Sequence, residues 1–437
     1  MQIRMRGQYS KMASNQIDFS NICIYNSKLD GSEFVGLKYE NDALKVYFPL
    51  GYHPAANIKE YRKDILNLIS VLSEFSEQHE SFFENEELTK KQIVQFPIHA
   101  YLYLITDYLN HGYYTERDVI YRQMNKGKIS WNKTVRQITP QIVDNNIVFF
   151  DFITRNVNHN ENHLITLIHQ YCVYESFEKI GFLFCDFMPQ KPSVEFNAAM
   201  FVSVLQMKLA QTFNENQQRL FSNMLSIIRF LDNSNDIKSV YYGTENFAYV
   251  WESLVDRVYG ISDKERFYPH CFWQIGKKKI GYSDASFMKY ALRPDTIMIT
   301  EQGKQNKQKI FVLDSKYYKY GESHSFGDLP SSGSIVKQIA YAQFIDRKES
   351  EHATGFEVKS EHIYNVFILP FDSNQSGRMK CVGYASSDYV DLFGTDAKEY
   401  YHIHGILLDV KSLMYEHNAH DDTSIAELSK MIENGGV

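Results

Sequence analysis

Residues 309–321 read KIFVLDSKYYKYG and contain the clearest strand signal of the chain. The run from Ile310 to Leu313 is short, apolar and rich in β-favouring side chains, which predicts a strand. Asp314 and Lys316 follow this run two positions apart, so both side chains project from the same face of an extended chain. A carboxylate and an ammonium group are therefore expected side by side where the strand ends.

A second strand is predicted just upstream, in LRPDTIMIT at residues 292–300. Asp295 lies at its start, and Pro294 suits the first position of a strand because no ladder donor is needed there. The polar loop EQGKQNKQ at residues 301–308 allows the two strands to pair as a hairpin. Such a hairpin would bring the carboxylates of Asp295 and Asp314 together.

Two converging carboxylates repel each other unless a cation lies between them. Hard oxygen ligands suit Mg²⁺, and Mn²⁺ is the second candidate. A bound metal and the ammonium group of Lys316 can polarise a phosphate, activate a water molecule and stabilise developing charge. The pattern therefore predicts a metal-dependent phosphodiesterase with Asp295 and Asp314 as metal ligands. The structural alternative is that the PD and DSK sequences occur here by chance.

Two predicted helices flank this pair of strands. The first covers ENFAYVWESLVDRVYG, residues 245–260, and offers Glu252 at the edge of its apolar face as a third acid for the metal. The alternative for Glu252 is an ordinary helix-surface carboxylate paired with Arg257 or with a residue elsewhere. The second helix, which we expect to be capped by Ser334, carries Gln338, which would support the region of Lys316 or contact DNA.

The order of predicted elements gives the fold class. After residue 236 it is helix, strand, strand, helix and two further strands, YNVFILPF and HIHGILLDV. Helices around central strands indicate an α/β core of nuclease type, in a chain that is mixed α+β overall. This core is expected to follow a β-containing N-terminal region and a helical connector.

Within the N-terminal region, SEFVGLKYENDALKVYFPLGYHP at residues 32–54 predicts a strand pair. Helices are predicted over residues 57–83 and 97–112, and NNIVFFDFITR at residues 145–155 is predicted as a strand. The pattern between Leu164 and Leu231 is helical. Together these patterns predict three domains, over residues 1–155, 156–235 and 236–437, with the main boundary near Asn235 in the polar stretch LDNSNDIKS.

A basic segment around one tryptophan lies in the first half of the chain. Its members, with no acidic residue among them, are Arg122, Lys126, Lys128, Trp131, Lys133 and Arg136. Lys and Arg side chains bind phosphates, and Trp131 could stack on a base. A solvated loop that docks a protein partner is the alternative reading of this basic cluster.

Composition excludes several classes of protein. The chain has 437 residues, 23% of them charged, and a formal charge of −7, so it does not coat itself with nucleic acid through a general basic surface. It has no apolar stretch long enough to span a membrane and no secretory signal pattern, so we expect a cytoplasmic protein. Because no GxxxxGK[ST] motif occurs, this chain is not expected to bind or hydrolyse a nucleotide itself.

The segments VWESLV, RPDTIMI, KIFVLDSKYYKYG and VKQIAYAQ resemble the C-terminal nuclease domain of McrC and of LlaJI-type restriction subunits. In the first half, SEFVGLKYENDALKVYFPLG and NKGKISWNKTVRQ resemble the LlaJI family more than McrC. The resemblance implies a PD-(D/E)xK restriction-endonuclease fold. It makes Asp295 and Asp314 metal ligands, Lys316 the catalytic lysine, and Glu252 the acid on the preceding helix.

The same resemblance implies a partner, an McrB-like AAA+ GTPase, onto which the helical stretch and the basic cluster would dock. The chain would then be the cleavage subunit of a restriction system, hydrolysing double-stranded DNA with Mg²⁺ in defence against foreign DNA. The alternative hypothesis is a non-catalytic adaptor that activates a GTPase motor and positions it on DNA.

Overall fold

The apolar patterns in the sequence form helices and strands in two separate units of the chain. The computed structural model describes residues 22–25, 33–40, 43–54, 57–78, 94–124, 126–143, 146–160, 163–234, 239–280, 292–301, 308–350, 362–373, 377–388, 398–416 and 422–435. Unit 1 is built from residues 94–240, and unit 2 combines the described part of residues 18–93 with residues 241–437.

A five-stranded mixed sheet forms the centre of unit 2. In spatial order its strands are β13 (Thr296–Thr300), β14 (Lys309–Ser315), β15 (Ile363–Phe371), β17 (Ile403–Asp409) and β16 (Met379–Ala385). The three central strands are parallel and the two outer strands pair antiparallel with them. Every residue of β15 is buried, as expected for a parallel strand covered on both faces. The expected mixed α/β class is confirmed.

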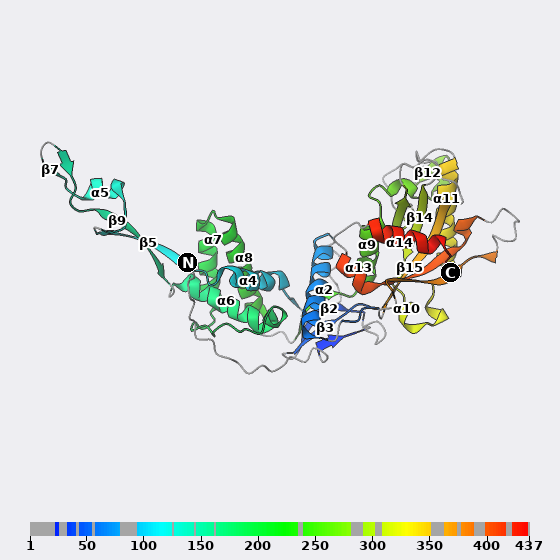
Figure 1. Ribbon diagram of the computed structural model, residues 1–437, viewed down its shortest axis with the longest axis horizontal. Coiled ribbons are helices and arrows are strands. Elements are labelled where there is room, and N and C mark those ends of the chain that lie inside the picture. The colour runs from blue at the N-terminus through cyan, green and yellow to red at the C-terminus, as the bar shows by residue number, and fades with distance from the viewer. Residues whose placement is uncertain are drawn as a thin grey trace. The chain divides into compact units, whose positions relative to one another are not determined.

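Helices cover this sheet (Figure 1). They are α9 (Phe247–Tyr259), α11 (Ser332–Ser350), α13 (Val410–Glu416) and α14 (Asp422–Glu433), with the short α10 (Tyr320–Ser323) and the 3₁₀ turns η3 (Glu265–Phe267), η5 (Phe326–Asp328) and η7 (Glu399–Tyr401). One core cluster joins α11 to β13 and β14 and includes Ile297, Ile310, Val312, Tyr341 and Ile345. The expected cap at Ser334 is wrong, because α11 already begins at Ser332 and Ser334 lies inside it.

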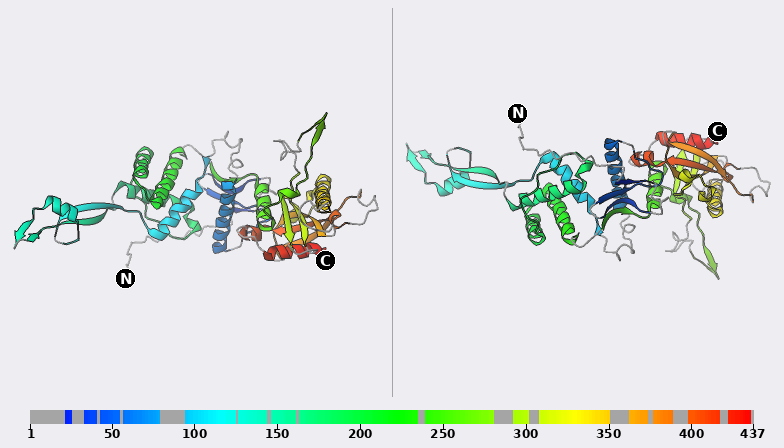
Figure 2. Two further views of the ribbon diagram at one scale, coloured as in Figure 1. Left: turned by 90° about the horizontal axis from the view of Figure 1, so that it is seen from above. Right: turned by 90° about the horizontal axis from the view of Figure 1, so that it is seen from below.

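Unit 2 also contains two smaller sheets. One is a hairpin of β11 (Trp273–Ile275) and β12 (Lys278–Ile280), which Figure 2 shows extending away from the central sheet. The other places β1 (Cys23–Ile24), β3 (Ala43–Tyr47), β2 (Val35–Glu40) and β10 (Ser239–Thr244) side by side. The pairing of β2 with β3 confirms the strand pair predicted around ENDA.

The N-terminal segment belongs to unit 2 through specific contacts. Helix α2 (Ile58–Gln78) buries Ile65, Ile69, Leu72 and Phe75 along one side. Its Asp64 accepts hydrogen bonds from Lys411 Nζ and Tyr415 Oη, both at 2.7 Å. The Leu50 N–H donates to the Tyr317 hydroxyl at 2.7 Å. These contacts join segments more than 260 residues apart, so the units do not follow the order of the three expected domains. The expected boundary at Asn235 lies outside the described residues.

Unit 1 holds four main helices and an extended β-region. The helices are α4 (Ile98–His111), α6 (Leu164–Ile180), α7 (Ala198–Gln211) and α8 (Glu215–Ser234), with η2 (Gly181–Leu183) after α6 and the short strand β4 (Val94–Gln95) before α4. The helical pattern predicted between Leu164 and Leu231 is confirmed. Helix α4 ends before Gly112, as predicted, with φ +76° at that glycine.

In the β-region of unit 1, β5 and β9 lead from these helices to a small part that contains α5 and β7 (Figure 1). Its elements are β5 (Glu116–Gln123), β6 (Lys128–Ile129), α5 (Trp131–Gln137), β7 (Gln141–Val143), β8 (Asn146–Val148) and β9 (Ile153–Asn160). The single strand predicted over residues 145–155 is wrong. It divides into β8, which pairs with β7, and β9, which pairs with β5 and β6.

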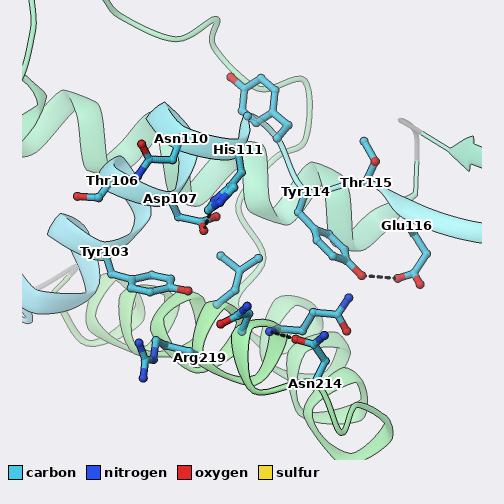
Figure 3. Close-up of a pocket in the computed structure, with 15 residues that line it drawn as sticks. Tyr103, Thr106, Asp107, Asn110, His111, Tyr114, Thr115, Glu116, Asn214 and Arg219 are labelled. Atoms are coloured by element: carbon cyan, nitrogen blue, oxygen red, sulfur yellow. Dashed lines mark hydrogen bonds and ion pairs between the residues drawn. The ribbon is translucent and has the colours of Figure 1, made fainter.

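A cavity of about 800 Å³ lies in unit 1 (Figure 3). Tyr103, Asp107 and Arg219 are among the residues that line it, and none of the site residues predicted from the sequence does. Within the described part of the chain, no helix combines the length and apolar character that crossing a membrane requires.

Candidate active site

Strand pairing places the two predicted carboxylates opposite each other. Strands β13 and β14 are antiparallel, and Thr296 lies opposite Leu313. Continued by one position, this register puts Asp295 opposite Asp314. Because side chains alternate along a strand, both carboxylates lie on the sheet face to which Ile297 also belongs. The hairpin expected from the sequence is therefore confirmed.

Asp314 is almost completely enclosed, with 3% of its surface exposed. Its Oδ2 lies 2.6 Å from Lys316 Nζ, so the ammonium group neutralises one side of the carboxylate. Its Oδ1 is buried and makes no hydrogen bond with any described residue. Burying a carboxylate oxygen without a partner is costly, and a bound cation would remove that cost.

Asp295 is held from two directions. Its Oδ2 accepts the Ser315 N–H at 2.8 Å, which ties it to β14 beside Asp314. Lys264 Nζ donates to the Asp295 carbonyl oxygen and to Asp256 Oδ2, both at 2.6 Å, which fixes the backbone where β13 begins. Lys264 was not identified from the sequence, because no local pattern links it to a residue 31 positions away.

The electrostatics of the pair favour a bound cation. Burial, together with the negative charges of Asp314 and Glu252, raises the pKa of Asp295 to about 7, against the opposing effects of the Ser315 N–H and the Lys316 charge. Burial lowers the pKa of Lys316, but the neighbouring Asp314 and Asp295 outweigh it, so its pKa is raised. Lys316 is therefore charged at neutral pH, while the acids repel one another.

Glu252, on α9, lies at the same site. Burial is the main reason that its pKa is raised, the charge of Lys316 opposes this effect, and the charge of Asp314 adds to it. Arg257, the partner considered for Glu252 as a surface carboxylate, forms an ion pair with Glu74 at 2.7 Å instead. The structure thus brings Glu252 together with Asp295, Asp314 and Lys316.

Gln338 lies on α11 with 1% of its surface exposed. Its Nε2 donates to the Val312 carbonyl oxygen at 2.7 Å, two residues before Asp314. Its Oε1 is also buried and has no hydrogen-bond partner among the described residues. This position fits support of β14 and leaves no surface for direct contact with DNA.

Three carboxylates, one of them with an unpartnered buried oxygen, form the donor set that a hard divalent cation prefers. Among the described residues, however, no group of three His, Cys, Asp or Glu side chains already has the arrangement of a metal cluster. In this arrangement Lys316 holds Asp314, and the acids repel one another. The residues fit a divalent metal in chemistry, and Glu252, Asp295 and Asp314 are the ones that would hold it.

The predicted basic cluster belongs to unit 1. Arg122, Lys126, Lys128 and Arg136 are exposed on or between β5, β6 and α5. Trp131 is 56% exposed and contacts Phe149 and Phe152 edge to face. Lys133 Nζ lies 3.5 Å from the centre of the Tyr121 ring, which partly commits this ammonium group to the protein's own surface.

Comparisons with known proteins agree with the resemblance. A family model described as LlaJI restriction endonuclease matches residues 34–398. The Type II restriction enzyme BsuMI component YdjA of Bacillus subtilis (strain 168) is 25% identical over 297 residues, which is 64% of this chain and 59% of that protein.

A solved assembly of Thermococcus gammatolerans McrB AAA+ hexamers with bound McrC contains a chain of 12% identity, with 92% of this chain and 82% of that chain covered. Its TM-score of 0.35 is too low to carry a conclusion about fold or partner.

Proposed function

Because this chain belongs to the LlaJI restriction endonuclease family, we propose that it is the cleavage subunit of a restriction system. In this proposal unit 2 is a PD-(D/E)xK nuclease that hydrolyses phosphodiester bonds of double-stranded DNA. The observation that carries it is the pair of opposed carboxylates, Asp295 and Asp314, beside the ammonium group of Lys316.

Each residue has a role that its surroundings support. Asp295, Asp314 and Glu252 would hold Mg²⁺, or Mn²⁺ in its place, and the metal would polarise the phosphate and activate water. Lys316, charged and 2.6 Å from Asp314, is placed to donate a hydrogen bond to a phosphoryl oxygen or to the attacking water. Gln338 positions β14 through the carbonyl oxygen of Val312.

A nucleotide-hydrolysing partner is part of the proposal. The sequence contains no GxxxxGK[ST] motif, and the relative YdjA is described as one component of a restriction enzyme. We therefore infer an McrB-like AAA+ GTPase as the partner that supplies nucleotide energy. The basic cluster of unit 1 is the candidate surface for that partner or for DNA.

Plasmid cleavage tests this function. The protein is incubated with Mg²⁺ or Mn²⁺, alone and with an McrB-like GTPase partner plus GTP, and Asp314→Asn is compared with the wild type. We expect the variant to lose at least 100-fold in cleavage rate, on the order of magnitude that a single charge-stabilising group contributes. It should also lose the Mn²⁺-induced rise in melting temperature, since a ligand that binds only the folded state stabilises it.

The control for this test is Lys63→Ala, which removes an exposed charge from α2 in the same unit. Full cleavage by Asp314→Asn would contradict the assignment of the site. A wild type that never cleaves DNA, while restriction in cells survives Asp314→Asn, would favour the non-catalytic adaptor.

A further inference from the structure

The β11–β12 hairpin is a second feature of unit 2 that calls for a functional explanation. Its two strands pair with Trp273 opposite Ile280 and Ile275 opposite Lys278. The turn between them contains Gly276 at φ +61°, a conformation that glycine adopts without strain. The Gln274 side chain donates to the Gly276 carbonyl oxygen at 2.6 Å and closes the turn. Figure 2 shows the hairpin projecting from the central sheet.

One face of this hairpin presents large apolar side chains to solvent. Trp273 is 63% exposed and Ile275 is 61% exposed. Strand alternation and the pairing register put both on the face that Lys278 shares. Trp273 makes no ring contact with the described aromatic residues, unlike Trp131, which packs against two phenylalanines. Such a face indicates an interaction site, because large exposed apolar groups gain by being covered.

The charge of the hairpin indicates the kind of partner. Residues 270–280 read HCFWQIGKKKI, with three consecutive lysines and no acid, in a chain whose overall charge is −7. Lys277 and Lys278 are exposed and form no ion pair with a described residue. A polyanion with apolar surface between its charges complements this combination of ammonium groups and an exposed indole. Duplex DNA has that chemistry.

The base of the hairpin lies close to Asp295 along the chain. The Leu292 N–H donates to the Pro269 carbonyl oxygen at 2.7 Å, so the chain that leaves at residue 269 returns at residue 292. Asp295 follows three residues later. The Tyr341 hydroxyl holds the intervening Arg293 carbonyl oxygen at 3.0 Å. The base of the hairpin and the candidate metal ligand therefore share one short backbone segment.

We propose that the β11–β12 hairpin binds the DNA duplex next to the phosphate that is cleaved, which rests on the proposed nuclease function. Lys277 and Lys278 contact backbone phosphates. Trp273 and Ile275 enter the adjacent groove, where an apolar side chain can wedge against a base step and unstack it. The base of the hairpin and Asp295 share one short backbone segment. Binding of DNA by the hairpin therefore sets the distance between the duplex and the carboxylates.

The test measures binding of a fluorescent DNA duplex by anisotropy over a range of salt concentrations. All variants carry Asp314→Asn and are measured in EDTA, so that the DNA stays intact whether or not Asp314 is essential for cleavage. We expect Lys277→Ala with Lys278→Ala to weaken binding about 10-fold and to reduce the slope of log affinity against log salt by about 2, one for each lost phosphate contact. The matched control, Lys59→Ala with Lys63→Ala, removes two exposed lysines from α2 in the same unit and should leave the slope unchanged.

A second variant tests the apolar contact of Trp273 separately from the charges of Lys277 and Lys278. Trp273→Ala should lower affinity about 10-fold without changing the salt slope, because it removes stacking and no charge. In a duplex that contains 2-aminopurine, protein binding should raise the fluorescence as the base unstacks, and Trp273→Ala should abolish this rise. Both sets of side chains are exposed, so unchanged melting temperatures will show that the variants are folded.

The outcomes distinguish this proposal from the nuclease function. Wild-type affinity and salt slope in the hairpin variants would overturn the DNA contact, as would a protein that binds no duplex at any salt concentration. If Trp273→Ala instead changes only the oligomeric state, the hairpin joins two copies of the chain and the proposal fails. Cleavage retained by Asp314→Asn would overturn the nuclease assignment and leave the binding comparison as it stands.

Discussion

At the scale of single residues, the raised pKa of Asp295 has a consequence for stability. Its pKa is about 7 in the folded protein, compared with an ordinary value of 3.8. The folded protein therefore keeps a proton that the unfolded chain has lost, and this linkage makes the free energy of unfolding fall as pH rises from about 4 to about 7. A buried acid that destabilises the fold and lies among other charged groups is typical of a site that binds a ligand.

Replacing this acid by its amide should stabilise the metal-free protein. Asp295→Asn keeps an oxygen for the Ser315 N–H and removes the repulsion from Asp314 and Glu252. In EDTA at pH 8 we expect the free energy of unfolding of the variant to exceed that of the wild type by about 1–3 kcal/mol. Near pH 4 we expect the two values to be equal. Urea denaturation at both pH values measures this. A variant less stable than the wild type at pH 8 would contradict the electrostatic account.

Among the helices and strands, α2 is linked to α13 through one buried carboxylate. Asp64 is 1% exposed and accepts hydrogen bonds from Lys411 and from the Tyr415 hydroxyl. Removing it leaves these partners without their acceptor in a partly buried position. The hydrophobic stripe of α2 brings the helix to unit 2, and Asp64 sets its register there.

Asp64→Ala should therefore destabilise unit 2 by about 2–4 kcal/mol. Lys63→Ala, one residue away and exposed, is the matched control and should change stability by less than about 0.5 kcal/mol. Chemical denaturation followed by fluorescence compares the two. Equal stabilities for both variants would show that apolar packing alone holds α2 in place.

The backbones of strands β2 and β10 also approach each other closely. A Cβ added at Gly36 in β2 would lie 2.2 Å from the Tyr242 carbonyl oxygen, and one added at Gly243 in β10 would lie 2.2 Å from the Val35 carbonyl oxygen. Glycines at these two positions let the backbones of β2 and β10 come together. The N-terminal hairpin is thus joined to the strand that leads into α9 and Glu252.

At the scale of the whole molecule, unit 2 is assembled from two distant parts of the chain. A fragment of residues 241–437 alone lacks the Leu50 N–H that pairs with Tyr317 and exposes Phe371, against which Gly51 packs. We expect this fragment to be insoluble or unfolded. Residues 18–93 joined by a flexible linker to residues 241–437 should instead fold with a cooperative transition.

Circular dichroism and thermal denaturation of the two purified fragments test this expectation. A cooperative transition in residues 241–437 alone would show that the N-terminal segment is an accessory to unit 2 and no part of its core. The joined fragment also offers a compact test of the site, because Asp295, Asp314, Lys316 and Glu252 all lie within it.

Patterns within short stretches of the sequence are enough to predict the local elements and the centre of the site. The periodic stripe of α2, the helices from Leu164 to Leu231 and the β13–β14 hairpin with Asp295 and Asp314 were all predicted from residues close together in the chain. Such elements depend on spacing within a few residues, and side-chain alternation fixes which groups share a face. The roles given to these site residues remain predictions.

The tertiary structure was needed to learn which distant segments belong together. It joined residues 22–78 to the C-terminal sheet, brought Lys264 to the Asp295 carbonyl oxygen and divided the expected strand at residues 145–155 into β8 and β9. It also left Trp273 exposed on a hairpin whose base lies three residues before Asp295. These features depend on complementary surfaces and on polar groups that find partners far along the chain, and no local pattern encodes them.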